Sequence, residues 1–427
     1  MPDGGSNDAK ECKKLIAKGI NVIILDHHII ETENPYAILI NPYRDKEKLN
    51  TDISGTGVVQ KFCSAYYSRY RNCEWGEVYN GYDIVGISLI SDICDLTSLE
   101  NRTMLYFGFE DTQNEFLDYL FTNKCKRRGK TTEAIGWDIA PLSNALARSD
   151  NQDGKLLFYN ALIGDLAPEV AVKKINAIKR ETDGLVKKAL AEIEPTLDLS
   201  KKVLVSFTKS EYKSFIGLVA MNIMKKYNKP SIVLRELNST TWTGSFRCDT
   251  MNLYSLINET NFATAQGHEH AGGVLVSKAN YHKFIDWLES LDIDDQPEIP
   301  VTAMVKAEDI NLNLVEQIKN NNDIYGNGVP SPTFYLKCNN RNSKVFVFEN
   351  RTNTIKIQIG DLSCLKFFVK EEEVTTFKNL ENYDIELIVG KCDSNEYNGI
   401  ITPQCQILNY EIHEKIKTKD ENWEDTF

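Results

Sequence analysis

Short apolar runs alternate with longer amphipathic segments along the first 163 residues of the chain. The β-branched run Ile20–Leu25 predicts a buried strand, and Asp83–Ile90 is interpreted in the same way. Helical patterns separate these runs: Asn7 is expected to cap one helix, and Ser54–Gly57 opens another. Strands that alternate with helices predict an α/β domain, in which helices cover both faces of a parallel sheet.

A long helical pattern runs from Pro168 to Glu194 and is ended by Pro195. It is rich in Ala, Lys and Glu, so we expect a solvent-facing helix that connects two domains. The next section predicts a smaller α/β domain, with strands at Lys202–Phe207 and Ser231–Leu234 and a helix at Ile216–Tyr227.

From residue 301 onward the pattern changes to short alternating strands, which predict a small barrel or sandwich. The strands are expected at residues 345–348, 354–359, 364–369 and 385–389. We therefore divide the chain into an α/β domain (1–163), a connector helix (164–195), a second α/β domain (196–300), a β-barrel (301–416) and an acidic tail (417–427). The loop-like start Pro2–Gly5 has no strand before it, so the first domain is expected to lack its opening element.

Composition narrows the class of protein. Of the 427 residues, 42% are hydrophobic and 26% are charged, as in globular proteins, and the net charge of −12 argues against a general coat for nucleic acid. No apolar run is long enough to span a membrane, and the N-terminus does not resemble a signal peptide. The ten cysteines include no CxxC pair, so we expect reduced thiols in a cytoplasmic protein and no structural zinc site.

Acidic and imidazole side chains follow the predicted strands. Asp26, His27 and His28 come directly after the first strand, Asp92 follows the second, and Asp3 lies in the opening loop. Because parallel strands present their carboxyl ends at one edge of a sheet, these residues are expected to converge. Mixed Asp and His ligands suit Mn²⁺ or Mg²⁺, and two such ions can clamp a phosphodiester and activate water. The alternative is that Asp26 caps a turn and that the histidines are surface groups.

A glycine- and histidine-rich motif, Gly267–Gly273, lies far downstream. Its small residues would let the backbone approach a phosphate, and His268 is a candidate phosphate ligand. Arg247 adds a guanidinium that is suited to bidentate phosphate contacts. The alternative is a glycine turn with incidental histidines and a surface arginine.

These motifs resemble the DHH phosphoesterase superfamily, and among its members the RecJ-type single-strand exonucleases. Pro2–Asp8 resembles the second motif of the family, Leu25–His28 the third and Ser91–Leu96 the fourth. Ser54–Val58 resembles the helix start between them, and Ile139–Arg148 resembles a segment that follows the fourth motif in RecJ proteins. The resemblance implies a DHH domain, a DHH-associated domain and an OB-like barrel. The first family motif, an Asp-x-Asp strand, is absent from the sequence.

The resemblance also implies roles for the candidate residues. Asp3, His27 and Asp92 would bind metal, while Asp26 and His28 would orient the ligands or help to activate water. In the DHH-associated domain the residues expected to bind substrate are Arg247, Gly267, His268, Gly272 and Gly273.

The last section resembles the OB barrel of RecJ proteins at Tyr325–Pro332 and Glu396–Ile401. Four phenylalanines are possible stacking platforms for bases, although most are expected to face the core: Phe346, Phe348, Phe367 and Phe368. The basic run Lys124–Lys130 is interpreted either as the path of a DNA backbone or as a solvated loop. The acidic tail is expected to be disordered, with docking on a partner as the alternative.

We therefore expect a metal-dependent hydrolase that degrades single-stranded DNA from the 5′ end in DNA repair or recombination; the polarity and pathway follow from the resemblance alone. One alternative is a phosphodiesterase of short oligonucleotides or cyclic dinucleotides. Another is a non-catalytic or split-enzyme subunit that binds single strands. Expected partners are single-stranded DNA and, further, a separate N-terminal polypeptide or a single-strand-binding protein.

Overall fold

The computed structural model describes residues 1–45, 47, 49–70, 81–148, 152–293, 299–349 and 352–414. The chain divides into two compact units, which are treated separately below. The first unit comprises Met1–Gln113, Cys125–Trp137 and Ile299–Phe427, and the second comprises Asn114–Lys124 and Asp138–Glu298. The acidic tail lies outside the described residues. Among the described residues, no helix is both long and apolar enough to cross a membrane.

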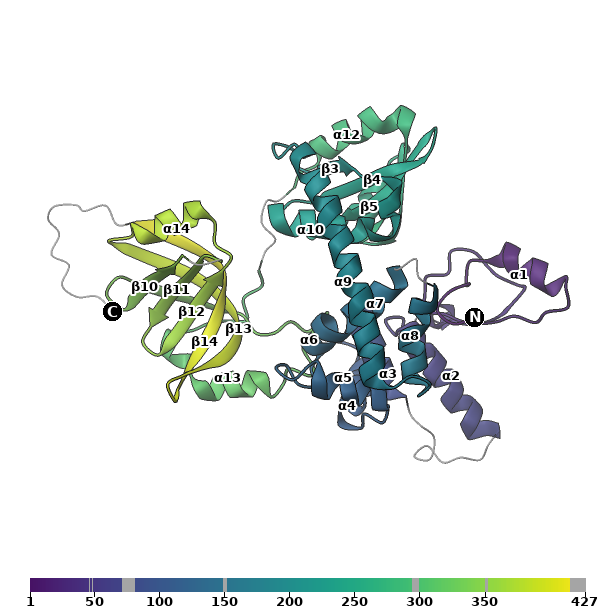
Figure 1. Cartoon of the computed structure of the whole chain (residues 1–427), viewed down its shortest axis with the longest axis horizontal. Helices are drawn as coiled ribbons and strands as arrows, with labels where there is room; N and C mark the ends of the chain where they lie inside the picture. The colour runs from purple at the N-terminus through teal and green to yellow at the C-terminus, as the bar shows by residue number, and fades with distance from the viewer. Residues whose placement is uncertain are drawn as a thin grey trace. The chain divides into compact units, whose positions relative to one another are not determined.

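The first unit begins with a small parallel sheet made of β1 (Ile23–Leu25) and β2 (Ile38–Ile40). Pro2 forms a parallel bridge with the last residue of β1, and the amide of Asp3 donates to the carbonyl of that same residue over 2.8 Å. The first residues of the chain therefore lie beside β1 like a short strand. Figure 1 draws this N-terminal part of the chain in purple. Asp3 and Asp26 leave the sheet at the same edge, as predicted.

Helix α1 (Ala9–Ile16) follows, but the predicted cap at Asn7 is wrong. The residue before the helix is Asp8, whose side chain forms no capping hydrogen bond. The Asn7 amide group instead donates to the carbonyl of Ile29 over 2.9 Å, and its oxygen accepts from the amide of Glu31 over 2.8 Å. Asn7 thus holds the loop that follows the two histidines.

The predicted strand at Asp83–Ile90 is also wrong, because this run is the helix α3 (Tyr82–Ser91). It packs between α2 (Gly55–Tyr70) and α4 (Leu99–Glu110). The contact with α4 is close: a Cβ on Gly108 would lie 2.3 Å from a carbonyl oxygen of α3. A helix that is apolar on nearly all sides has no helical period in its sequence, so the run resembles a buried strand. Asp92 therefore follows a helix.

The last part of the first unit is the predicted β-barrel, made of seven strands in the order β10-β11-β12-β14-β13-β9-β8. They are β8 (Ala303–Met304), β9 (Phe334–Asn339), β10 (Ser343–Phe348), β11 (Thr354–Ile359), β12 (Leu362–Phe367), β13 (Tyr383–Tyr397) and β14 (Ile400–Glu414). Only residues 340–342 separate β9 from β10, so one bent segment supplies strands near both margins of the sheet and curls it into a barrel. Helix α13 (Leu312–Lys319) packs against β13 and β14, and α14 (Glu371–Lys378) packs against β10.

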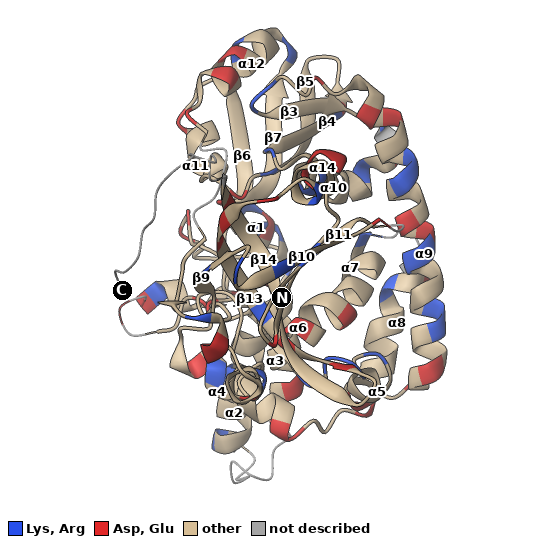
Figure 2. Cartoon of the chain, turned by 90° about the vertical axis from the view of Figure 1, so that its left-hand side faces the viewer, with Lys and Arg blue, Asp and Glu red and all other residues tan. Residues whose placement is uncertain are grey.

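The second unit contains the predicted long helix, α9 (Pro168–Ile193), with a proline at its start. Helices α5 (Glu115–Asn123), α7 (Ala140–Arg148) and α8 (Gln152–Leu162) pack along it. Figure 2 shows Lys and Arg positions in blue and Asp and Glu positions in red along the ribbon of α9, as expected for a helix with one solvent-facing side. Seven of its side chains are buried, so the other side is a packing surface.

A five-stranded sheet completes the second unit, in the order β3-β4-β5-β7-β6. The strands are β3 (Leu204–Phe207), β4 (Ser231–Asn238), β5 (Thr241–Arg247), β6 (Ala263–His268) and β7 (Ala271–Ser277). Helix α10 (Ile216–Tyr227) matches its prediction and packs with α9 and the sheet, while α11 (Leu253–Asn258) and α12 (Tyr281–Ser290) share the core with Phe246 and Val274.

Candidate metal centre and nucleic-acid interface

Three of the predicted ligands meet at the edge of the small parallel sheet in the first unit. Nε2 of His27 lies 3.1 Å from Oδ1 of Asp3 and 3.4 Å from Oδ2 of Asp92. The His28 ring packs edge-on against the His27 ring, and the ligand atoms of Asp3, His27 and His28 lie within 4.8 Å of one another. The structure therefore brings together residues from the start of the chain, the end of β1 and the end of α3.

The electrostatics of this cluster match a cation site. The hydrogen bond with Asp3 raises the pKa of His27, and the same bond lowers the pKa of Asp3. His27 also forms a backbone hydrogen bond with Ile53, which fixes the ring. When His27 is protonated, its Nε2–H group lies between the carboxylates of Asp3 and Asp92. A divalent cation would compete with that proton, so we expect cation binding to weaken as the pH falls below the raised pKa of His27.

Close packing holds Asp3 in place. Its backbone has a φ of 55°, a left-handed conformation that aspartate tolerates better than most residues. A Cβ on Gly55, the first residue of α2, would lie 2.3 Å from Oδ1 of Asp3. Only glycine leaves room there for the carboxylate, which explains the glycine at the helix start that the sequence displays.

Asp26 is buried, and its carboxylate accepts the hydrogen bonds that hold the loop after β1 in place. Its Oδ1 accepts from the amide of His27 over 2.8 Å and pairs with Nδ1 of His28 over 2.7 Å. Its Oδ2 accepts from the hydroxyl of Ser6 over 2.6 Å, and Nδ2 of Asn41 donates to that hydroxyl. Burial alone would raise the pKa of Asp26, but the hydrogen bonds outweigh it and lower the pKa to about 2. Asp26 therefore orients both histidines.

Replacement of Asp26 by asparagine is expected to reduce the free energy of unfolding at neutral pH by about 2 kcal/mol. The pKa of Asp26 is lowered on folding from 3.8 to about 2, so its stabilisation is complete above pH 3.8 and is lost as the pH falls towards about 2. Urea unfolding of both proteins across this range measures the difference. A gap that stays constant with pH would contradict the assignment.

Asp92 stands at a strained helix end. Helix α3 closes with the amide of Cys94 donating to the carbonyl of Leu89 and the amide of Ile93 donating to the carbonyl of Ile90. This is the Schellman arrangement, in which the left-handed residue is usually glycine. Here it is Ile93, with a φ of 55° and 71% exposure. The sharp turn directs the chain away from the helix immediately after Asp92.

Replacement of Ile93 by glycine is expected to raise the free energy of unfolding by about 1 kcal/mol, because glycine adopts a positive φ without steric cost. Ile29→Gly is a matched control: Ile29 is also exposed and lies outside helices and strands, but it is not among the positive-φ residues. The control should lose stability. Urea unfolding measures both, and equal losses in the two variants would contradict strain at Ile93.

The loop that leads into the barrel supports the Asp92 turn. Nδ2 of Asn327 donates to the carbonyl of Ile93 over 2.8 Å, and the amide of Leu96 donates to the carbonyl of Asn327 over 2.9 Å. Gly328 has a φ of +76°, and a Cβ on it would lie 2.1 Å from Oδ1 of Asp95. The tight glycine turn is therefore required for the barrel segment to reach the loop that carries Asp92.

In the second unit, the sheet register places Arg247 and His268 in one row. Arg247 pairs with Ala271 across β5 and β7, and Ala271 pairs with His268 across β7 and β6. Residues in one row point to the same face, so the small Ala271 separates the two side chains by about 10 Å of strand spacing. The predicted association of Arg247 with His268 is thus compatible with the register.

The glycines of the motif lie on two different faces. Gly272 pairs with Gly267 in the neighbouring row, and a Cβ on Gly272 would lie 2.7 Å from the ring of Phe246. Gly272 therefore makes room for a core aromatic ring, whereas a Cβ on Gly267 would lie 2.8 Å from the Cα of Gly272. A Cβ on Gly273 would meet nothing closer than 3.8 Å, and it shares its face with Arg247. Of the three glycines predicted to bind substrate, Gly273 is the one with free space above its Cα atom.

Arg148 is a candidate that the sequence reasoning did not single out. It and Arg247 are both partly buried in the second unit, burial lowers the pKa of each guanidinium, and Arg148 lowers the pKa of Arg247 further. The Nε atom of Arg247 is buried without a hydrogen-bond partner, and its Nη2 lies close to Gly217 in the first turn of α10. Two guanidiniums and a helix N-terminus are the groups that proteins use to bind anions, so this place is a candidate anion site. The signal in the sequence was the segment that ends at Arg148.

The barrel presents an aromatic surface, and the prediction that most of the four phenylalanines face the core is wrong. Phe346, Phe348 and Phe367 are each more than 40% exposed, and Phe368 is 80% exposed. The register places Phe348, Thr354 and Phe367 in one row, and Lys356 lies over the ring of Phe346. We name these four phenylalanines and Lys356 the aromatic face. Val345 and Val347 take the inward positions instead.

A hollow of about 740 Å³ lies between the barrel and the helices of the first unit. It is lined by Ile93 at the end of α3 and by Phe367 of the aromatic face. Its wall carries the cations Arg127, Arg128, Lys319 and Lys391 and the carboxylates Glu133 and Asp393. Part of the predicted basic run therefore faces a positively charged hollow, and this hollow joins the Asp92 turn to the aromatic face.

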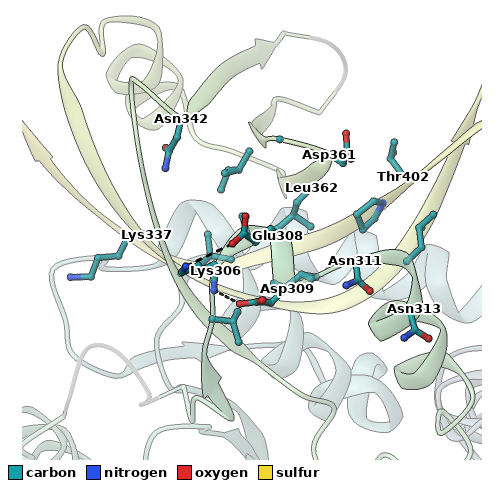
Figure 3. A pocket seen from close by; sticks show the side chains of 18 of the residues that line it. Lys306, Glu308, Asp309, Asn311, Asn313, Lys337, Asn342, Asp361, Leu362 and Thr402 are labelled. Atoms are coloured by element: carbon teal, nitrogen blue, oxygen red, sulfur yellow. Dashed lines mark hydrogen bonds and ion pairs between the residues drawn. The ribbon is translucent and has the colours of Figure 1, made fainter. Parts of the chain in front are cut away.

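A second hollow, of about 1600 Å³, lies elsewhere on the barrel (Figure 3). Its wall mixes Lys306 and Lys337 with Glu308, Asp309 and Asp361. Lys306 pairs with Glu308 and its amide donates to Asp309, as the dashed lines in Figure 3 show. A wall of mixed charge does not favour a polyanion, so the larger hollow is the weaker candidate for nucleic acid.

Comparisons with known proteins place this fold beside RecJ-type proteins. Residues 301–409 match the RecJ OB domain family. The chain is 25% identical to the putative SPbeta prophage-derived single-strand DNA-specific exonuclease YorK of Bacillus subtilis, over 98% of this chain and 78% of that protein. The predicted resemblance to RecJ-type proteins of the DHH superfamily is confirmed.

Solved structures agree with this fold. RecJ from Thermus thermophilus in complex with Mn²⁺ superposes with a TM-score of 0.76 at 18% identity, over 97% of this chain and 62% of that one. The Mg²⁺ complex of the same protein gives a TM-score of 0.69 at 17% identity, over 97% of this chain and 66% of that one. The chain thus spans less than two thirds of these two RecJ chains.

Proposed function

We propose that the chain is a metal-dependent nuclease that hydrolyses single-stranded DNA from its 5′ end, in DNA repair or recombination. The observation that carries the proposal is the convergence of Asp3, His27 and Asp92 in a chain that also contains a RecJ OB domain. The curated relative named above is described as a single-strand DNA-specific exonuclease, which supports the substrate class.

The donor set fits Mn²⁺ or Mg²⁺, because two carboxylates and an imidazole converge at an accessible edge of the sheet. Such an ion, when bound, would activate water and stabilise charge on the phosphate. Asp3, His27 and Asp92 would hold it. Asp26 keeps the His28 ring in one orientation through its Nδ1, and this leaves Nε2 of His28 available to a proton of the substrate or of water.

The substrate would be bound by the surfaces described above. In the first unit, the positively charged hollow suits a phosphate backbone, and the aromatic face suits stacked bases. In the second unit, Arg247, Arg148 and His268 would bind phosphate, with Gly273 leaving the surface open and Gly267 and Gly272 supporting it from the core side. A binding surface of several nucleotides favours a polymer over a cyclic dinucleotide.

The test is release of nucleotides from single-stranded DNA that carries a label at one end, with Mn²⁺ present. We expect early release of mononucleotide from a 5′ label, late release from a 3′ label, and little release from a blunt duplex. Loss of release with a chelator and its recovery with Mn²⁺ would show the metal requirement. Preferential cleavage of a cyclic dinucleotide would overturn the substrate assignment.

The aromatic face makes a separate prediction. Replacement of Phe348 by alanine should weaken binding of single-stranded DNA by about 10-fold, because stacking on an aromatic side chain contributes roughly 1–3 kcal/mol per base. Phe107→Ala is the control, since Phe107 is equally exposed but belongs to α4. Fluorescence anisotropy with a labelled oligonucleotide measures both. Equal affinities of the two variants would remove the aromatic face from the binding surface.

A further inference from the structure

Two buried thiols face each other across the long hairpin of the barrel. Cys392 lies in β13 and Cys405 in β14, and their Sγ atoms are 3.0 Å apart. Both belong to the core of the barrel, with exposures of 8% and 1%. Buried cysteines are usually isolated apolar side chains, so contact between two of them needs a structural cause.

The cause is a β-bulge in the hairpin. Gly390 pairs with Gln406 and Asp393 pairs with Gln404, so that Lys391 and Cys392 together oppose the single residue Cys405. Lys391 takes a φ of 47°, which is unusual for a residue with a side chain. The bulge leaves Lys391 exposed and Cys392 buried, and it brings the second thiol directly over the first.

The thiols are buried but can be reached from one side. Cys392 and Cys405 both line the positively charged hollow of about 740 Å³, together with Lys391 and Lys319. A small solute that enters the hollow can therefore come next to both cysteines without unfolding of the barrel. The more exposed Cys392 shares a hydrogen bond with Cys405, and this bond lowers the pKa of Cys392. Positive charge in the hollow also favours a thiolate.

We propose that Cys392 and Cys405 are a redox modification site, at which a hydroperoxide converts the two thiols into a cross-strand disulfide. The thiolate of Cys392 attacks the peroxide, takes up one oxygen as a sulfenic acid and releases water or an alcohol. The thiol of Cys405 then attacks that sulfur, the S–S bond forms, and the sulfenic oxygen leaves as water. The two thiols lose two electrons, which reduce the O–O bond, and a dithiol reverses the change.

The disulfide would close the hairpin at its bulge. It would join β13 to β14 across a short loop of chain, which restricts the unfolded state and stabilises the folded one. The oxidised protein should therefore unfold at a temperature higher by roughly 5 °C, and dithiothreitol should reverse the shift. This inference concerns the barrel alone and does not depend on nuclease activity.

The test uses the unmodified full-length protein. It is reduced, freed of reductant, treated with hydrogen peroxide, unfolded in N-ethylmaleimide, and digested with trypsin. Cleavage after Lys391 yields one peptide, Cys392–Lys415, which contains both cysteines and no other. We expect this peptide to become two hydrogens lighter and to take up no maleimide, while the peptide with Cys364 remains alkylated.

Variants and an internal reference make the result decisive. After peroxide treatment, Cys405→Ala should form no disulfide within this peptide, whereas Cys364→Ala, which replaces another buried cysteine of the barrel, should retain the disulfide. The exposed Cys63 reports that peroxide has acted. The proposal is overturned if Cys392 and Cys405 both stay alkylated after Cys63 is oxidised, or if either thiol is linked to a different peptide.

Discussion

Replacement of Asp92 by alanine is expected to reduce Mn²⁺-dependent release of nucleotides by roughly 100-fold or more, because the cation loses one of its carboxylate ligands. Oδ2 of Asp92 lies 3.4 Å from Nε2 of His27, and Asp3 contacts the same nitrogen. Without Asp92 the imidazole faces a single carboxylate, so Mn²⁺ affinity should fall as well. Initial rates at a series of Mn²⁺ concentrations separate weaker cation binding from slower hydrolysis.

The matched control is Asp52→Ala, which removes another exposed carboxylate. The charge of Asp52, like that of Asp92, raises the pKa of Cys94, so both carboxylates act on the same part of the protein. It lowers the local negative charge without removing a predicted ligand, so its activity should stay close to that of the unmodified protein. Circular dichroism at the assay temperature verifies that both variants are folded. Similar losses in the two variants would mean that general electrostatics, rather than coordination, explains the role of Asp92.

Replacement of Arg247 by alanine should raise KM for single-stranded DNA by about 30- to 100-fold, the effect of losing a charged, partly desolvated phosphate contact. The Nε atom of Arg247 is buried and lacks a partner within the described structure, so its binding capacity is available to a ligand. Arg247→Lys keeps the charge but loses the planar fork, and an intermediate KM is expected. Steady-state kinetics on an oligonucleotide substrate provide the measurement.

Arg235→Ala controls for the loss of a positive charge from the same sheet, since Arg235 lies on β4 and donates to the backbone carbonyl of Glu236. Its KM should change little. An Arg247→Ala variant with an unchanged KM would show that the buried guanidinium serves packing of the second unit instead. The same result would remove Arg148 from the proposed phosphate site.

Local patterns predicted much of the architecture. Helix α10 begins and ends at the predicted residues, α9 ends one residue early, and β11 matches its predicted range. These segments have clear periods or clear end signals, such as Pro195 after α9. The candidate metal ligands of the first unit could also be located in the sequence, because Asp26, His27 and His28 are adjacent and directly follow a short apolar strand.

The sequence-based predictions are wrong where tertiary packing, rather than the local pattern, determines the structure. Helix α3 is buried on nearly all sides, so its sequence lacks the period that separates a helix from a strand. The exposed Phe346 and Phe348 alternate with Val345 and Val347, and alternation alone cannot tell which set faces the core. Arg148 and Arg247 are close in the structure but far apart in the sequence, so no local pattern predicts that they lie together.

The glycine turn before the barrel limits where this protein can be truncated. Asn327 and Gly328 contact the loop that carries Asp92: the side chain of Asn327 donates to the carbonyl of Ile93, and its backbone carbonyl accepts from the amide of Leu96. A C-terminal deletion that removes the barrel together with this turn would remove the support of the proposed metal site. The two are therefore not independent modules, and the barrel cannot be exchanged for another binding domain unless residues 326–328 are kept.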